Sequence, residues 1–180
     1  MNCPSCGAPM HLKADEDSYK CEYCHSVFLP PAGDDGVRVL GEASADACPI
    51  CNVPLVEAAL AKLRIEYCTR CHGMLIPMGE FQALVDELRS VGGGSAEQPA
   101  AEGGDLRRKI GCPHCHGAMD AHFYAGPGNV VMDSCEDCAL IWLDRGELMH
   151  IVRAPDSREA PPEFETAFGD DDTTGTARWN

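Results

Sequence analysis

The sequence predicts a small, β-rich fold in which three short units follow one another, each stabilised by a bound metal. Two observations predict this class. All 12 cysteines of the 180-residue chain fall into Cys-x-x-Cys pairs, and the pairs form three consecutive couples. Aromatic residues make up only 6% of the chain, which argues against a large conventional core. Units of roughly 30 to 45 residues rarely hold a core unaided and usually depend on a metal.

The cysteine spacing predicts three zinc sites with four thiolate ligands each. Such a site takes two ligands from one tight turn, called a knuckle, and two from a second knuckle across a hairpin. We therefore expect three tandem zinc ribbons, which are antiparallel hairpins with four-cysteine sites, and three zinc ions. The predicted ligand sets are Cys3, Cys6, Cys21 and Cys24; Cys48, Cys51, Cys68 and Cys71; and Cys112, Cys115, Cys135 and Cys138.

The first unit is predicted to be the shortest of the three ribbons. Its last cysteine is followed by Val27-Phe28-Leu29, an apolar triplet expected to form the strand beside the metal site. Pro30-Pro31 comes next and prevents a helix at this place. The following segment is rich in Gly, Ala and Asp, which is typical of a linker.

The second unit is predicted to be a ribbon followed by a helix. Leu63, Ile65 and Tyr67 alternate with charged residues, a period-two pattern that indicates a strand. Met74-Leu75-Ile76 occupies the place of the apolar triplet, and Pro77 suits a first helical turn. One apolar helix face is then expected from Phe81, Leu84, Val85 and Leu88.

The third unit is predicted to be the most complete copy. A hairpin is expected at Gly126-Pro127-Gly128-Asn129, between apolar flanks, and the apolar triplet is Ile141-Trp142-Leu143. Trp142 is expected to pack in the core. Asp144 and Glu147 match a capping box, with Asp144 as the N-cap of a short helix, so they are interpreted as capping residues and not as a catalytic pair.

The chain is thus divided into six predicted segments. They are a first ribbon at 1–30, a linker at 31–47, a second ribbon with its helix at 48–91, a flexible linker at 92–108, a third ribbon with a short helix at 109–153, and a disordered acidic tail at 154–180.

The third unit resembles the bacterial transcription factor IIB-type zinc-ribbon family. The residues that carry this resemblance are Cys112-Pro113-His114-Cys115, Cys135-Glu136-Asp137-Cys138 and the stretch Ile141 to Leu148, which reads IWLDRGEL. The second unit is similar to a diverged copy, with Leu75 in place of Trp142 and Pro77 in place of Asp144. The resemblance implies a zinc-ribbon fold with four cysteine ligands in each unit, and it implies little about activity.

The charge of the chain disfavours non-specific binding to nucleic acid. With 14 basic and 29 acidic residues, the formal net charge is -15, which repels phosphate backbones. The local basic groups are Lys62, Arg64, Arg70 and Arg107-Arg108-Lys109. No apolar stretch is long enough to span a membrane, and the first predicted ligand stands at position 3, where a signal peptide would begin. A reducing cytoplasm is therefore the expected location.

No catalytic residue and no cofactor site besides the metal sites is predicted. Four thiolates leave no open coordination position for water or substrate, so hydrolytic zinc chemistry is not expected. His25, His72 and His114 lie within or beside knuckles and could replace a ligand, although four cysteines already complete each site. Iron in a rubredoxin-like site is the alternative metal.

Three functions fit these features. The leading hypothesis is a non-enzymatic protein that binds protein partners, because the metal sites are closed and the chain is acidic. The first alternative is a transcription-associated or nucleic-acid-binding protein, and the second is a redox-sensitive zinc switch. The pattern leaves open the partner, the oligomeric state and whether the ribbons pack together.

Overall fold

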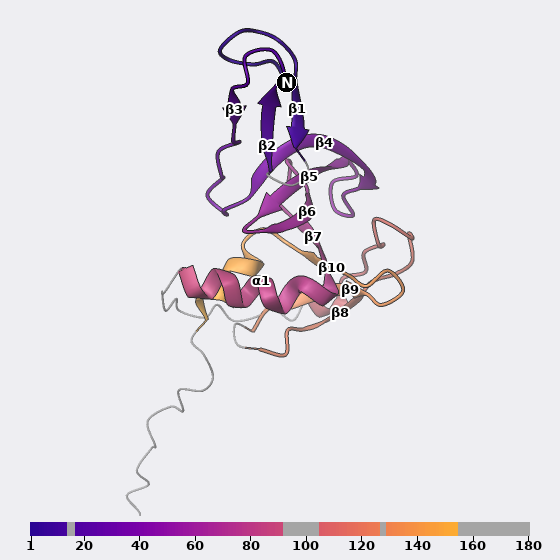
Figure 1. Cartoon of the computed structure of the whole chain (residues 1–180). Coiled ribbons are helices and arrows are strands. Elements are labelled where there is room, and N and C mark those ends of the chain that lie inside the picture. Colours follow the sequence, from indigo (N-terminus) through magenta and orange to yellow (C-terminus); the bar gives the residue numbers. More distant parts are fainter. Residues whose placement is uncertain (14–16, 92–104, 127–128, 155–180) are drawn as a thin grey trace, which may run out of the picture.

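The computed structural model describes residues 1–13, 17–91, 105–126 and 129–154 (Figure 1). Most of the predicted linker at 92–108 and all of the predicted tail except Ala154 lie outside these residues, as do Pro127 and Gly128 of the predicted hairpin turn. No helix in the described part of the chain is long and apolar enough to cross a membrane.

The first unit is a separate three-stranded antiparallel sheet at the top of Figure 1. Its strands are β1 (Met10–Lys13), β2 (Ser18–Cys21) and β3 (Val27–Phe28), in that order across the sheet. The third strand coincides with two residues of the predicted apolar triplet. A small buried core of Cys3, Met10, Tyr19 and Cys21 lies beside the knuckles.

The second and third units share one seven-stranded antiparallel sheet, with the order β4-β5-β6-β7-β10-β9-β8. These two units therefore pack together. The strands are β4 (Arg38–Ala47), β5 (Pro54–Leu60), β6 (Leu63–Tyr67), β7 (Met74–Pro77), β8 (Asp120–Phe123), β9 (Val131–Cys135) and β10 (Leu140–Leu143).

The linker predicted at 31–47 is wrong over residues 38–47, which form the edge strand β4. This strand pairs with β5 and shifts its register twice along its length. Such bulges interrupt the alternation of inward and outward side chains, so a period-two pattern is missing from the sequence. Leu40 is fully buried, and Gly41 adopts a φ of +81°, which favours glycine.

A local two-fold axis relates the second and third units at the junction of β7 and β10. Trp142 pairs with Leu75 in the register, and these two residues are equivalent when the units are aligned on their cysteines. The neighbouring pairs, Ile141 with Ile76 and Leu143 with Met74, exchange under the same operation. The arrangement is that of an isologous dimer interface, here formed within one chain.

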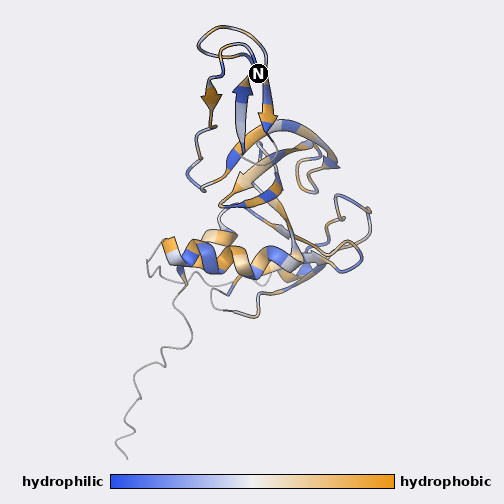
Figure 2. Ribbon diagram, viewed as in Figure 1, coloured by the Kyte–Doolittle hydropathy of each residue, from blue (hydrophilic) through white to orange (hydrophobic). Residues whose placement is uncertain are grey.

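Two helices cover one face of this sheet, and hydrophobic segments of the strands and helices meet there (Figure 2). Helix α1 (Met78–Val91) buries Phe81, Leu84 and Val85, which belong to its predicted apolar face. Helix α2 (Glu147–Arg153) buries Leu148, Ile151 and Val152. A short 3-10 turn, η1 (Asp105–Arg107), precedes the third unit. Arg89 of α1 ties the two helices by donating to the Ile151 carbonyl at 2.7 Å.

The predicted N-cap of α2 is wrong, because Gly146 and not Asp144 occupies the cap. Gly146 has a φ of +88°, and no side chain caps the helix. Half of the predicted capping box is present, since Glu147 Oε2 accepts the Asp144 backbone N–H at 2.7 Å. The Asp144 carboxylate turns away from the helix toward Trp142 and Arg108, which use its oxygens instead.

Candidate metal centres

The twelve cysteines meet in three groups of four, and each group is one of the predicted ligand sets. Within each group the sulfur atoms all lie within 4.8 Å of one another. Sγ–Sγ distances in these groups include 3.5 Å for Cys3 and Cys24, 3.6 Å for Cys48 and Cys71, and 3.7 Å for Cys115 and Cys135. A zinc–sulfur bond of about 2.3 Å gives a tetrahedron whose edges are about 3.8 Å. The sulfurs are therefore spaced for a tetrahedral zinc ion and too far apart for disulfides, whose sulfurs are about 2 Å apart.

The first five knuckles along the chain are closed by the same backbone hydrogen bonds. The N–H of the first cysteine donates across the turn, as from Cys48 to the Val53 carbonyl at 2.8 Å and from Cys68 to the Gly73 carbonyl at 2.9 Å. The fourth residue after this cysteine has a positive φ in all six knuckles. Those residues are Gly7, His25, Asn52, His72, His116 and Ala139.

This left-handed position explains two of the histidines considered as ligands. His25 and His72 occupy it, and each donates its backbone N–H to the carbonyl of the first cysteine of its knuckle. The His72 ring forms a 2.5 Å hydrogen bond with the Tyr67 hydroxyl. His114 instead faces Asp46 at 3.4 Å. The four-residue groups consist of cysteines alone, so none of these histidines is needed as a ligand.

Backbone amides support the thiolates of the second site. The Cys51 N–H points to Cys48 Sγ at 3.3 Å, and the Cys71 N–H points to Cys68 Sγ at 3.5 Å. Such N–H donors stabilise negative charge on sulfur, which is the form that binds metal. When zinc is bound, it supplies the cross-link that holds the two knuckles of a unit together.

The second and third sites lie against one buried apolar cluster. Leu75 and Trp142, the residues on the two-fold axis, belong to it together with Leu55, Ile110 and Met119. The cluster also contains the buried cysteines of both sites: Cys48, Cys68, Cys112 and Cys135. The first site has its own core around Met10 and Tyr19. Loss of metal from the second or third site should therefore disturb both of these units.

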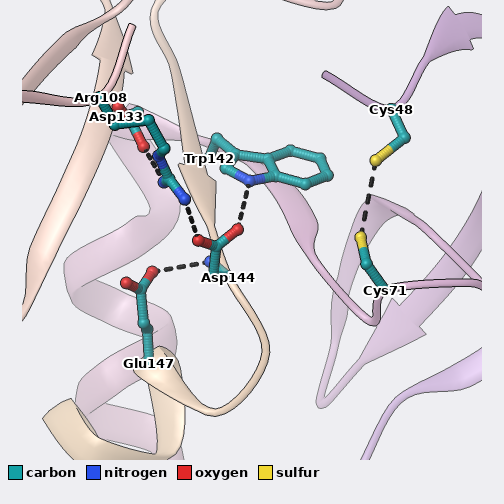
Figure 3. Close-up of polar contacts among 7 residues, drawn as sticks. All are labelled: Cys48, Cys71, Arg108, Asp133, Trp142, Asp144 and Glu147. Atoms are coloured by element: carbon teal, nitrogen blue, oxygen red, sulfur yellow. Dashed lines mark hydrogen bonds and ion pairs between the residues drawn. The ribbon is translucent and has the colours of Figure 1, made fainter. Parts of the chain in front are cut away.

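A partly buried polar network joins Arg108, Asp133, Trp142, Asp144 and Glu147 of the third unit (Figure 3). The Trp142 indole N–H donates to Asp144 at 2.9 Å. The Arg108 guanidinium bridges Asp144 and Asp133, and Asp133 is fully buried. Burial raises the pKa of Asp133 in spite of its ion pair with Arg108. Burial also raises the pKa of Glu147, to about 7.

This network was not predicted from the sequence, because Arg108 was considered only as one of the local basic groups that could contact nucleic acid. Two other members of that set are also engaged in ion pairs. Lys62 contacts Glu87 at 2.9 Å, and Arg64 contacts Asp17 at 2.6 Å and Glu57 at 3.2 Å. Half of the basic groups considered for nucleic-acid binding therefore have acidic partners within the chain.

Two regions of the chain, residues 47–87 and 111–154, match the model of the transcription factor zinc-finger family, a TFIIB-type zinc ribbon. The resemblance predicted from the third unit, and for the second as a diverged copy, is confirmed. Neither the curated proteins nor the solved structures include a match to the chain.

Proposed function

We propose that this protein, whose second and third units match the model of the transcription factor zinc-finger family, is a non-enzymatic module that binds other proteins. Its three units act as tandem zinc ribbons that hold binding surfaces in place. The observation that carries this proposal is the composition of the metal sites. Four cysteines complete each tetrahedron, so a bound zinc ion has no position left for a substrate.

Exposed apolar side chains on the first unit support a role in protein binding. Tyr23 is 81% exposed, Val27 61% and Leu29 51%. Tyr23 lies in the second knuckle of this unit, Val27 in its last strand β3, and Leu29 directly after that strand. Single exposed apolar residues are ordinary on protein surfaces. Several on a unit of this size, at the free edge of a three-stranded sheet, favour contact with a partner.

Affinity capture with the zinc-loaded full chain tests the proposal. We expect one or more specific protein partners, and we expect their recovery to fall when Tyr23→Asp and Val27→Asp are combined. Val91→Asp is a matched control, because Val91 is 84% exposed at the end of α1, away from the first unit. Absence of any specific partner for the native chain would contradict the proposal. Equal loss in the control would show a general effect of added charge.

A transcription-associated role is the second candidate, favoured by the description of the matching family. Direct contact with nucleic acid would have to use basic residues such as Arg70, Arg107 and Lys109, against a net charge of -15. Salt-dependent retention on DNA or RNA, lost when these three residues become alanine, would support this role. No retention at low salt would remove direct binding and leave a protein contact in the transcription machinery.

The redox switch remains a further alternative with a separate test. Exposed Cys6, Cys24 and Cys115 are the ligands that an oxidant would reach first. Mild peroxide should then release zinc, and the circular dichroism signal of the strands should decrease at the same time. Retention of zinc under this treatment would exclude the switch, and a colourless purified protein would exclude iron.

A further inference from the structure

We propose that a groove formed mostly by the second unit, with His114, Cys138 and Leu140 of the third unit at its border, binds an arginine-bearing segment of a partner protein. Its place on the second unit corresponds to that of Arg108 and Trp142 on the third unit. The inference rests on the proposed protein-binding function, for which it names one contact surface. The groove is lined by Asp46, Glu57, Glu66, Leu75, Pro77 and Leu140, among others. It therefore combines three carboxylates with an apolar floor.

The two-fold relation between the units places corresponding residues at matching positions around the groove and around Arg108. Glu66 stands two residues before Cys68, as Asp133 stands two residues before Cys135. Ser44 stands four residues before Cys48, as Arg108 stands four residues before Cys112. The contacts correspond as well, since Arg108 pairs with Asp133 and the Ser44 hydroxyl donates to Glu66 Oε1 at 2.6 Å.

Ser44 is much shorter than Arg108 and leaves the Glu66 carboxylate incompletely paired. Glu66 Oε2 is buried and has no hydrogen-bond partner among the described residues. An unpaired buried carboxylate oxygen is costly, and a charged guanidinium compensates a carboxylate more strongly than a neutral hydroxyl does. On the third unit, Arg108 donates one N–H to Asp133 Oδ2 and another to Asp144 Oδ2, so its guanidinium joins two carboxylates (Figure 3). Asp133 Oδ1 has no partner among the described residues.

The apolar part of the groove follows from the second difference between the units. On the third unit, the Trp142 indole is fully buried and lies so close to Gly73 that a Cβ there would be 2.3 Å from its Cζ2 atom. On the second unit the equivalent residue is Leu75, and Pro77 replaces Asp144. A smaller side chain at this position leaves Leu75, Pro77 and Leu140 as a floor for an apolar side chain beside the arginine.

The charges around the groove favour a cation. Among the positive groups that line it, Arg64 is committed to Asp17 and Glu57, and the His114 ring faces Asp46. Glu66 is left with a neutral hydroxyl as its hydrogen-bond donor. Arginine is preferred to lysine, because separate N–H groups of a planar guanidinium can reach two carboxylates, as Arg108 does on the third unit.

The test uses two capped dipeptides, acetyl-Trp-Arg-amide and acetyl-Trp-citrulline-amide, which differ in charge and have nearly the same shape. Amide shifts of the zinc-loaded, isotope-labelled full chain are followed during titration. We expect the arginine probe to move signals of Glu66, Leu75 and Leu140, with an affinity at least about tenfold higher than that of the citrulline probe. Glu66→Gln should remove most of this difference.

A variant that fills the groove from within provides the decisive comparison. Ser44→Arg should pair with Glu66 as Arg108 pairs with Asp133, and it should abolish binding of the arginine probe. Ser90→Arg adds the same charge at an exposed position of α1 and should leave binding unchanged. Zinc content and the remaining amide signals verify that both variants fold.

Three results would overturn the inference. No shift at the groove, while the native chain still captures partners, would refute this surface and leave the proposed function standing. Tighter probe binding after Arg178→Ala and Trp179→Ala would show that the chain's own Arg178-Trp179 pair competes for the groove. A dimer in sedimentation that Ser44→Arg dissociates would identify a second copy of the chain as the occupant.

Discussion

Replacing Gly73 with alanine should destabilise the joined second and third units, and Trp142 is the reason. The new Cβ would lie 2.3 Å from Cζ2 of Trp142 and 3.0 Å from two further ring atoms, whereas ordinary carbon contacts begin at about 3.5 Å. The fully buried indole cannot swing into solvent. Overpacking of this kind costs about 1–3 kcal/mol, against a gain of about 0.5 kcal/mol from a stiffer unfolded chain.

A double-mutant cycle isolates the contact. Trp142→Leu alone should cost about 2–3 kcal/mol, because it removes buried ring atoms and the indole hydrogen bond to Asp144. It also places the same residue on both sides of the two-fold axis and frees the space next to Gly73. In this background Gly73→Ala should be nearly neutral, so the coupling energy should be about 1–3 kcal/mol.

The assay is urea unfolding followed by circular dichroism, with free zinc held constant by a metal buffer, since bound metal adds to apparent stability. Tryptophan fluorescence is unsuitable, because one of the variants removes Trp142. An equal cost of Gly73→Ala in both backgrounds would refute the reasoning, since the strain would then have a source other than the indole.

Three other perturbations act on the Arg108 network, on Glu147 and on the metal ligands. Arg108→Ala should cost about 3–5 kcal/mol in urea unfolding, because it leaves the Asp133 carboxylate buried without its ion pair, and adding Asp133→Asn should recover much of this loss. Burial raises the pKa of Glu147 to about 7, so the folded protein favours the protonated acid. The contribution of this group to the free energy of unfolding is fully present below the unfolded pKa of the carboxyl, and it is lost as the pH rises through 7. Glu147→Gln should therefore become more stable relative to the native chain by about 1 kcal/mol between pH 6 and pH 8, and a constant difference would contradict this. Native mass spectrometry should find three zinc ions; Cys24→Ser should remove one and leave the amide signals of α1 unchanged, whereas Cys71→Ser should disturb both the second and third units, because they share a buried cluster.

The metal sites could be predicted because the residues that define each site lie close together in the sequence. Four cysteines in two knuckles define a site without reference to the rest of the chain, and the periodic patterns at Leu63–Tyr67 and along α1 are likewise local. Strand β4 was missed because its two register shifts remove the alternation by which a strand is recognised.

The shared sheet and the Arg108 network depend on long-range pairing, which spacing does not report. Met74-Leu75-Ile76 and Ile141-Trp142-Leu143 are apolar at every position, a sign of strands covered on both faces. That signal indicates burial and does not identify the partner strand. Arg108 finds its acids 25 and 36 positions further along the chain, so its neighbours in sequence gave no indication of its role.

The junction of β7 and β10 has a consequence for how unlike the two halves can be. In a dimer of identical subunits, the residue on the axis faces a copy of itself, so an indole there would have to accommodate a second indole. Two halves encoded in one polypeptide escape that restriction, and Trp142 can face Leu75 across the axis. In the third unit, side chains of the chain itself can then fill this position, while the corresponding groove beside the second unit stays open to other molecules.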